Sequence, residues 1–191
     1  MPFLWAYGAI VVVFVIVGLL TIDRGLLRER LRPAPGGKDR HLRAVLAPFA
    51  LAHFAIAGLD VGHFHWSGPL PLPLRVAGLA GVALSLGLVG WTMTVNRFFS
   101  PIVRIQEERG HHVITAGPYR CVRHPGYVGM VCAFLCSSLA LGSWWSMVPV
   151  AGYALLIVRR AALEDRFLRE QLPGYAEYAA RVRYRMVPGL W

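Results

Sequence analysis

The chain has 191 residues, of which 56% are hydrophobic and 16% are charged, and its formal net charge is +10. Soluble domains carry charges on about a quarter of their residues, so the composition argues against a soluble protein and predicts one helical membrane domain. The positive charge alone is compatible with nucleic acid, but no nucleic-acid-binding motif accompanies it, and we expect no such partner.

Three apolar segments come first along the chain, at 2–22, 44–61 and 72–95. Each has close to the 20 or so residues that a helix needs to cross a bilayer. The first segment has neither a basic start nor a cleavage-site pattern, so we expect a retained anchor. The third is rich in small residues spaced four apart, which let helix backbones approach closely in lipid. This spacing favours packing within the chain and leaves a homodimer open.

A fourth apolar region, 127–158, is too long for one straight span. The sequence LGSWW at 141–145 supplies turn residues and interfacial aromatics at its middle, which predicts a helical hairpin. The chain is therefore expected to be an all-α polytopic membrane protein with about five transmembrane helices, the last two forming the hairpin. We divide it into a three-helix transmembrane region, 1–95, and a region 96–191 made of a loop, the hairpin 126–158 and C-terminal helices.

The basic residues predict the orientation in the membrane. Of the 20 Lys and Arg residues, 19 lie between the first two segments, between the third and fourth, or after the fifth; the exception is Arg75. Cytoplasmic loops carry the excess of Lys and Arg. We therefore expect an integral protein of a bacterial inner membrane, with its N-terminus outside and its C-terminus and active site in the cytoplasm. The Pro- and Gly-rich stretch 33–38 is expected to be a cytoplasmic loop.

Asp60, His63 and His65 are grouped on the predicted external side. Such residues can bind a metal, but no further ligand is apparent near them and Trp66 follows directly. We interpret the group as an interfacial cluster of amphipathic rings and expect no metal site.

The stretch GPYRCVRHPGYVG at 117–129 carries rings, charges and turn residues beside an apolar segment. His124 precedes Pro125, so its backbone is held extended. Pro125 suits the first turn of a helix, which makes His124 a cap residue and puts Tyr127 within that helix. The pattern predicts a polar notch at the cytoplasmic membrane surface, suited to a flat heteroaromatic ligand with polar edges. The alternative is an aromatic belt that only anchors a helix end.

Strong helix formers fill 159–172 (RRAALEDRFLREQL), and Pro173-Gly174 ends that predicted helix. Arg160 and Glu164 are four residues apart, so they share one helix face. The hairpin brings this pair close to the His124 end of the fourth segment. A solvated surface ion pair is the alternative interpretation.

Four pieces of sequence now form a pattern: VITAGPYRCVRHPGYVG at 113–129, Arg160-x3-Glu164-Asp165, Tyr175-x2-Tyr178, and RVRYRMVPGLW at the C-terminus. Together they resemble the isoprenylcysteine carboxyl methyltransferase family of integral membrane enzymes, over residues 95–191. The RHPxY part is shared with phospholipid methyltransferases and some membrane reductases.

The resemblance implies S-adenosyl-L-methionine as the cofactor of an active region at 96–191. Glu164 would hold the charged amino-acid end of that cofactor, and Arg160 would bind the methyl acceptor, so these two are the candidate catalytic residues. Asp165 stands where the family more often has a second Glu. The residues that the family pattern places along the cofactor are Gln106, His111, His112, Val113, Ile114, Tyr119, His124, Pro125, Gly126 and Tyr127.

Methyl transfer from a sulfonium is an in-line displacement, so the enzyme mainly aligns and desolvates the reactants. A carboxylate acceptor is already ionised at neutral pH and needs a guanidinium to orient it, a role suited to Arg160. An amine, phenol or thiol acceptor would need a base, for which His124 and Tyr127 are the candidates. The acceptor is expected to be lipophilic or small and to enter from the lipid bilayer.

Three other functions stay open. An NADPH-dependent membrane reductase is disfavoured, because such relatives tend to have Asn before the motif Tyr and an acidic residue soon after it, where this chain has Gly126 and Gly129. A phospholipid N-methyltransferase-like enzyme would share the cofactor and differ in the acceptor. A non-enzymatic membrane scaffold would bind no cofactor.

Overall fold

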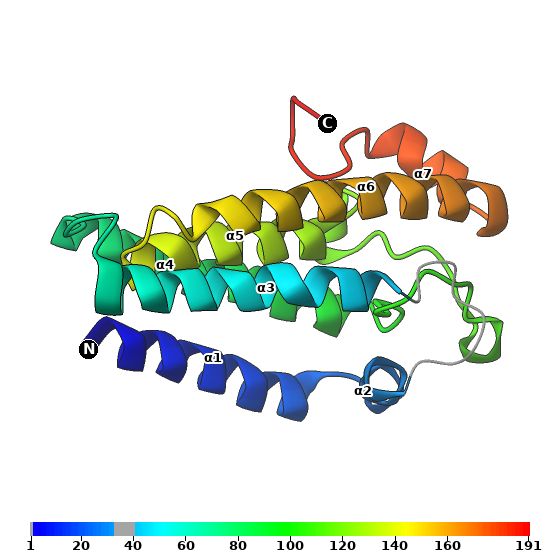
Figure 1. The fold of residues 1–191 in the computed structure, drawn as a ribbon. Helices are drawn as coiled ribbons and strands as arrows, with labels where there is room; N and C mark the ends of the chain where they lie inside the picture. Colours follow the sequence, from blue (N-terminus) through cyan, green and yellow to red (C-terminus); the bar gives the residue numbers. More distant parts are fainter. Residues whose placement is uncertain (1, 33–40) are drawn as a thin grey trace.

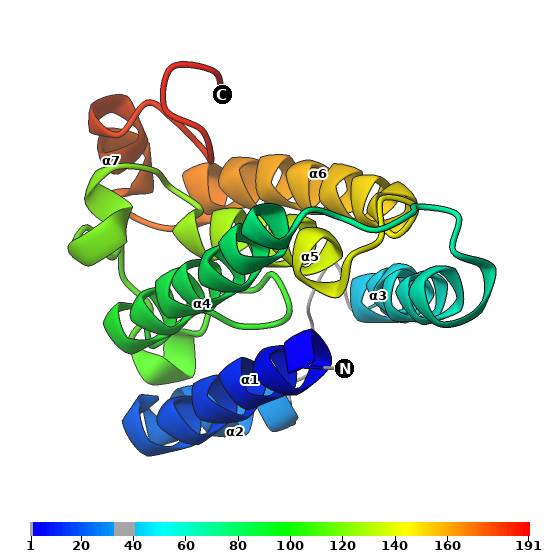
Figure 2. The same cartoon turned by 90° about the vertical axis from the view of Figure 1, so that its left-hand side faces the viewer.

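The computed structural model of the chain describes residues 2–32 and 41–191. The described residues form helices and no strand, which confirms the all-α class (Figures 1 and 2). The stretch 33–38, expected to be a loop, lies outside the described residues. The long helices lie roughly side by side, so that their connections gather at the two ends of the molecule (Figure 1).

Three of the described helices are long and apolar enough to cross a membrane. They are α1 (Pro2–Thr21), α3 (Leu42–Leu59) with the π-helical turn η1 (Asp60–Phe64) that continues it, and α4 (Leu72–Val95). These helices coincide with the three predicted apolar segments. Length and apolar composition therefore sufficed to find them, as expected where a helix must satisfy its backbone in lipid.

Two further helices, α5 (Pro125–Leu141) and α6 (Met147–Gln171), flank a short connection. Gly142 ends α5 with a φ of 90°, a backbone conformation that favours glycine. The apolar helix α5 is 17 residues long, and α6 joins an apolar first half to a charged second half. The five-segment count therefore stays a prediction. The charged helix expected from 159 is continuous with the apolar helix before it.

Glycines allow α4 and α5 to pack closely, in the most extensive contact between described helices. A Cβ atom on Gly78 would lie 2.5 Å from the backbone nitrogen of Ala140, and one on Gly129 would lie 2.8 Å from the carbonyl oxygen of Ser85. No other residue fits at such distances without moving a helix. Gly78 and Gly81 of the third segment therefore serve packing within the chain, whereas Gly87 meets nothing within 4 Å and the homodimer stays a prediction.

The polar end of the molecule carries the helices α2 (Arg24–Leu31) and α7 (Tyr175–Arg181), with the single turns η2 (Glu107–Arg109) and η3 (Gly117–Arg120) in the segment between α4 and α5 (Figure 1). Asp23 caps α2, because its carboxylate accepts a hydrogen bond from the Leu26 N–H at 2.8 Å. These short elements surround the start of α5 and the second half of α6.

At the opposite end, Asp60 is fully buried at the start of η1. Its carboxylate accepts hydrogen bonds from the N–H and hydroxyl of Ser67 and from the hydroxyl of Ser143, which ties the 60–71 connection to the turn after α5. His63 packs its ring edge against Phe64. Within 2–32 and 41–191, no group of three His, Cys, Asp or Glu side chains could hold a metal ion.

Candidate active site

His124 caps α5, and Pro125 is the first residue of that helix, as the sequence predicts. The His124 N–H donates to the carbonyl of Arg185 at 2.8 Å, so the C-terminal segment holds the cap in place. The His124 ring stacks on the Tyr127 ring, with 5.5 Å between centroids and 9° between planes. The helix start therefore presents two parallel rings at the polar end of the molecule.

A chain of polar contacts joins α5 to α6 beside these rings. The Arg160 Nε donates to the Tyr127 hydroxyl at 2.6 Å, and that hydroxyl donates to the carboxylate of Glu164. Arg160 Nε and Glu164 Oε2 are 4.0 Å apart, and an Arg160 Nη2 also donates to the Pro101 carbonyl at 2.8 Å. The predicted pair thus shares one face of α6 and lies close to His124, with Tyr127 between its two charges.

One cavity lies between the α4–α5 segment, the start of α5, the second half of α6 and α7. Its enclosed space is about 60 Å³, room for only a few water molecules. A larger ligand therefore requires part of this lining to move. Residues 97–114, which supply part of the lining, are called the covering segment below. The predicted site residues that line this cavity are His111, His112, Val113, Ile114, Tyr119, His124, Gly126, Tyr127 and Glu164.

Three predicted site residues lie elsewhere. Gln106 is fully buried beneath the cavity, where its amide donates to the Phe98 carbonyl at 2.8 Å and accepts from Arg109 at 2.5 Å. The amide nitrogen and oxygen of Gln106 thus bond to residues of the covering segment itself. Gln106 does not line the cavity. Pro125 is buried at the helix start. Arg160 lines a different hollow.

That second hollow is a groove of about 650 Å³ between α3 and the second half of α6. Leu156, Leu163 and Phe167 of α6 give it an apolar wall. Arg160 lies in its lining, although Glu164, one turn further along the helix, lines the small cavity. The Arg160–Tyr127–Glu164 contact therefore connects the small cavity, which is polar and ring-lined, with the groove, which is largely apolar.

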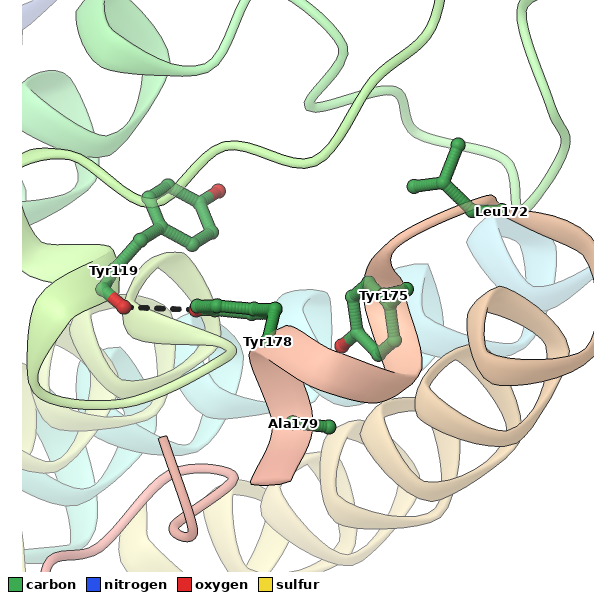
Figure 3. Packing of buried hydrophobic residues seen from close by; sticks show 5 residues of the cluster. All are labelled: Tyr119, Leu172, Tyr175, Tyr178 and Ala179. Carbon is green, nitrogen blue, oxygen red and sulfur yellow. Dashed lines mark hydrogen bonds between the residues drawn. The ribbon is translucent and has the colours of Figure 1, made fainter. Parts of the chain in front are cut away.

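Three tyrosines form the wall of the small cavity on the side of α7 (Figure 3). The Tyr178 hydroxyl donates to the Tyr119 carbonyl at 2.8 Å, and the Tyr119 hydroxyl accepts from the Asn96 amide at 2.7 Å. Burial raises the pKa of Tyr119, Tyr175 and Tyr178 above the ordinary tyrosine value. These phenols therefore stay protonated and provide flat, neutral surfaces.

Asp165 is a buried hub that the sequence did not assign to any contact. Its carboxylate accepts from Arg123 Nε at 2.6 Å, from Arg185 Nε at 3.0 Å and from the Tyr175 hydroxyl at 3.1 Å. Burial by itself would raise the pKa of this carboxyl group, but the neighbouring His124, Arg123 and Arg185 outweigh burial and hold the pKa well below its ordinary value. The ionised hub ties the loop before α5, the C-terminal segment and α7 to α6.

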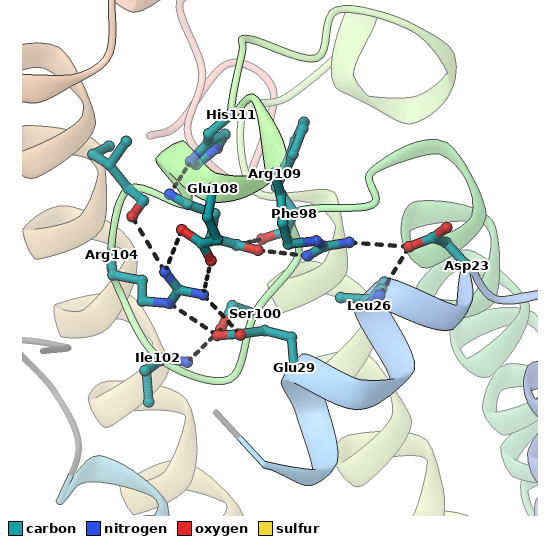
Figure 4. Close-up of polar contacts among 12 residues, drawn as sticks. Asp23, Leu26, Glu29, Phe98, Ser100, Ile102, Arg104, Glu108, Arg109 and His111 are labelled. Atoms are coloured by element: carbon teal, nitrogen blue, oxygen red, sulfur yellow. Dashed lines mark hydrogen bonds and ion pairs between the residues drawn. The ribbon is translucent and has the colours of Figure 1, made fainter. Parts of the chain in front are cut away.

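Ion pairs join the covering segment to α2 and to its cap residue Asp23 (Figure 4). The Glu29 carboxylate pairs with Arg104 at 2.8 Å, and both side chains are more than 90% buried. Asp23 pairs with Arg109 at 3.0 Å. The sequence analysis missed both pairs, because their partners are 75 and 86 residues apart and no local spacing signals them.

His111 belongs to the covering segment and packs against Phe98 of the same segment, with 4.5 Å between ring centroids. Its Nδ1 accepts a hydrogen bond from the Gln106 N–H at 3.3 Å, which requires an unprotonated Nδ1. Burial, together with the nearby charges of His112, Arg104 and Arg109, lowers the pKa of His111 to about 4. At neutral pH the ring is therefore uncharged beside the cavity.

The residues around the small cavity fit S-adenosylmethionine by chemistry. His124 Nε2 is buried without a hydrogen-bond partner among residues 2–32 and 41–191, and Asp165 lies 3.9 Å away, so a ligand could satisfy this atom. Glu164 is a carboxylate with its side chain 21% exposed, suited to an ammonium group. The tyrosine rings and Val113 suit a heteroaromatic base.

A family model described as phospholipid methyltransferase matches residues 74–173, which is more than half of the chain. The chain therefore belongs to the phospholipid methyltransferase family, and this class of protein accounts for its apolar helices and for the motifs of its C-terminal half. The matched region runs from α4 into the end of α6 and includes His124, Tyr127, Arg160 and Glu164.

Individual relatives carry two kinds of name, metal-resistance proteins and methyltransferases. The chain is 34% identical over 134 residues to the cobalt-zinc-cadmium resistance protein CzcN of Cupriavidus metallidurans, covering 67% of this chain and 56% of that protein. It is 35% identical over 97 residues to a probable protein-S-isoprenylcysteine O-methyltransferase of Oryza sativa subsp. indica, covering 47% and 48%. Protein-S-isoprenylcysteine O-methyltransferase B of Arabidopsis thaliana is 28% identical over 97 residues, with 47% of each chain covered.

The chain spans about half the length of these relatives. The plant relatives confirm the resemblance to the isoprenylcysteine carboxyl methyltransferases that the sequence motifs indicate.

Proposed function

We propose that this chain is an S-adenosylmethionine-dependent methyltransferase that transfers a methyl group to a lipophilic or small acceptor from the bilayer. The observation that supports this best is the Arg160–Tyr127–Glu164 contact between the two hollows. A cofactor in the small cavity and an acceptor in the groove would meet at this contact. The site would then serve a reaction between a polar and an apolar substrate.

Bound in the small cavity, S-adenosylmethionine would supply an electrophilic methyl group on its sulfonium. Glu164 would hold the ammonium end of the cofactor by a charge-assisted hydrogen bond. His124 Nε2 would donate to or accept from a polar atom of the same ligand. Tyr119, Tyr175 and Tyr178 would enclose the base and exclude water. Alignment and desolvation of this kind are what an in-line displacement requires.

The groove beside Arg160 supports an acceptor with an acidic head and an apolar body. Its wall from α6 combines Leu156, Leu163 and Phe167 with polar residues of the same helix. The polar residues are Arg159, Arg160, Arg166 and Glu170, of which Arg166 and Glu170 pair with each other at 3.0 Å. A carboxylate is ionised at neutral pH, so Arg160 would orient it without removing a proton. The names of the plant relatives support a carboxylate acceptor. An amine acceptor, which the family name suggests, would need Tyr127 or His124 as a base.

The proposed site sets the arrangement in the membrane. We assign the region 96–191 as the catalytic part and the polar end as cytoplasmic, where the cofactor is dissolved. The helices α1, α3 and α4 and the α5–α6 pair would form five membrane segments. In this arrangement the acceptor reaches the groove sideways from lipid.

The test distinguishes the acceptor groove from the cofactor cavity. Arg160→Ala is expected to abolish transfer of labelled methyl from S-adenosylmethionine to lipid extracts while it leaves S-adenosylhomocysteine affinity within about twofold. Arg181→Ala, an exposed arginine on α7, is the matched control and should keep full transfer. Unchanged transfer by the Arg160 variant would remove Arg160 from the site. Tight binding of NADPH in place of S-adenosylhomocysteine would favour the reductase.

A further inference from the structure

A second apolar groove, of about 550 Å³, lies between α1 and α4 and shares no lining residue with the small cavity or with the groove beside Arg160. Its lining is apolar apart from Thr21, Trp91 and Thr94, which lie at the C-terminal ends of the two helices. Glycines on both helices, among them Gly87, widen the groove. Neither Arg160 nor Glu164 lines it, so it is not part of the acceptor site.

The length of the groove matches one leaflet of a bilayer. Along α1 its lining runs from Ala9 to Thr21, a distance of about 18 Å at the helical rise of 1.5 Å per residue. Half of the hydrocarbon core of a bilayer is about 15 Å thick. A single acyl chain from the leaflet nearer α2 could therefore lie along the whole groove. Trp91 is 54% exposed at the α2 end, typical of a residue at the lipid–water boundary.

Positive charge surrounds that end of the groove. Arg24 begins α2 shortly after Thr21, and Arg97 follows the end of α4; both side chains are exposed. The Arg97 Nη2 donates to the carbonyl of Arg109 at 3.4 Å, and the Arg109 side chain pairs with Asp23. Arg97 and Arg109 both lie over the Phe98 ring, and Arg24 follows Asp23 directly in the chain, so arginines outnumber the one carboxylate in this group. The surplus of positive charge is suited to the phosphate of an anionic lipid.

We propose that this groove binds one anionic phospholipid, with an acyl chain between α1 and α4 and its phosphate against Arg24 and Arg97. The charges favour an anionic headgroup over a zwitterionic one, because a neighbouring ammonium would be repelled by the same arginines. The bound lipid would join α2 to the start of the covering segment from the outside. This site does not depend on methyl transfer, and its test is independent of cofactor binding.

The charge of the site is tested on the full chain purified in a mild detergent. Native mass spectrometry should detect one retained phosphatidylglycerol, and added phosphatidylglycerol should raise Tm, whereas phosphatidylcholine should not. The double variant Arg24→Gln/Arg97→Gln should bind phosphatidylglycerol about tenfold more weakly, since two lipid contacts are lost. Arg181→Gln/Arg183→Gln removes the same charge from exposed residues near α7 and should bind as the wild type does.

The groove itself is tested by filling it. A Cβ atom on Gly87 would have nothing within 4 Å, so Gly87→Phe can project into the groove without displacing a neighbour. This variant should retain phosphatidylglycerol about tenfold less well at an unchanged Tm in lipid-free detergent. Gly58→Phe, on α3, is the matched control because a Cβ there also meets nothing within 4 Å.

Three results would overturn the proposal, two of them on lipid retention. One is equal retention of phosphatidylglycerol by the wild type and both test variants. The other is equal binding of phosphatidylcholine, which would show an apolar groove without headgroup selection. If Gly87→Phe instead raised KM for the methyl acceptor and kept lipid retention, the groove would be a substrate path and the lipid assignment would be wrong.

Discussion

Glu164 and Asp165 are adjacent carboxylates with opposite surroundings. The Glu164 side chain borders the small cavity, 21% exposed and in contact with Tyr127. Asp165 is fully buried and paired with arginines from three parts of the chain. One residue is therefore placed to meet a ligand, and the other to hold the elements that form the cavity.

Asp165→Asn should destabilise the protein strongly. The change leaves Arg123 buried without its charge partner, and losing one partner of a buried pair costs about 3–5 kcal/mol. Thermal unfolding in detergent should show a clearly lower Tm. Glu177→Gln removes an exposed carboxylate from α7 and should leave Tm nearly unchanged. Equal Tm values for the two variants would contradict the role of the hub.

Acid should loosen the cover of the cavity through His111. Its pKa is lowered from 6.5 to about 4 in the folded protein, so the unfolded chain binds a proton more readily between these values. Stability supplied by the neutral ring is complete above pH 6.5 and is lost as the pH falls toward 4. The Tm should fall less over this range in His111→Gln than in the wild type. Parallel pH profiles would show that His111 does not contribute.

Helix starts and apolar spans were predictable from the sequence because their causes are local. Pro125 fixes the start of α5, and α4 has the predicted bounds 72–95. The continuity of α6 was missed, because Arg159 and Arg160 were interpreted as the end of an apolar helix. The helix does not end at those arginines. Only the side chains change there, from apolar to charged, and the helix-forming residues that follow continue the same helix.

The candidate site was predictable where it follows the motifs and not where it depends on distant pairs. His124, Tyr127 and Glu164 come together because α5 and α6 are neighbours in the chain. Gln106 was expected beside the cofactor, but its burial depends on the local turn at 106–111. The pairing of Glu29 with Arg104 joins α2 to the irregular segment between α4 and η2, far apart in sequence, for which one sequence contains no signal.

At the contact between α4 and α5, Gly78→Leu should be strongly destabilising. A side chain there would meet the Ala140 backbone and the Cys136 carbonyl, neither of which can move without shifting a helix. Overpacking of this kind costs about 1–3 kcal/mol or more. Gly58→Leu, which enters open space, is the control. A wild-type Tm for Gly78→Leu would mean that the two helices are less close than described.

The whole molecule has one polar end, which we propose to be cytoplasmic. Cys121 is exposed at this end, whereas Cys132 and Cys136 lie along the apolar helix α5 and are partly buried. A membrane-impermeant maleimide should therefore label inverted membrane vesicles and not intact cells. Cys121→Ser should abolish the labelling. Labelling of Cys121 in intact cells would reverse the proposed orientation.

The small cavity is the feature on which the proposed activity depends, and cofactor binding tests it most directly. Calorimetric titration of the purified full chain with S-adenosylhomocysteine should show one site per chain. Glu164→Gln should weaken binding about 10- to 100-fold, the value of one charge-assisted hydrogen bond, and Glu177→Gln should bind as the wild type does. Absence of binding by the folded wild type, or equal affinity in Glu164→Gln, would contradict a methyltransferase site at this cavity.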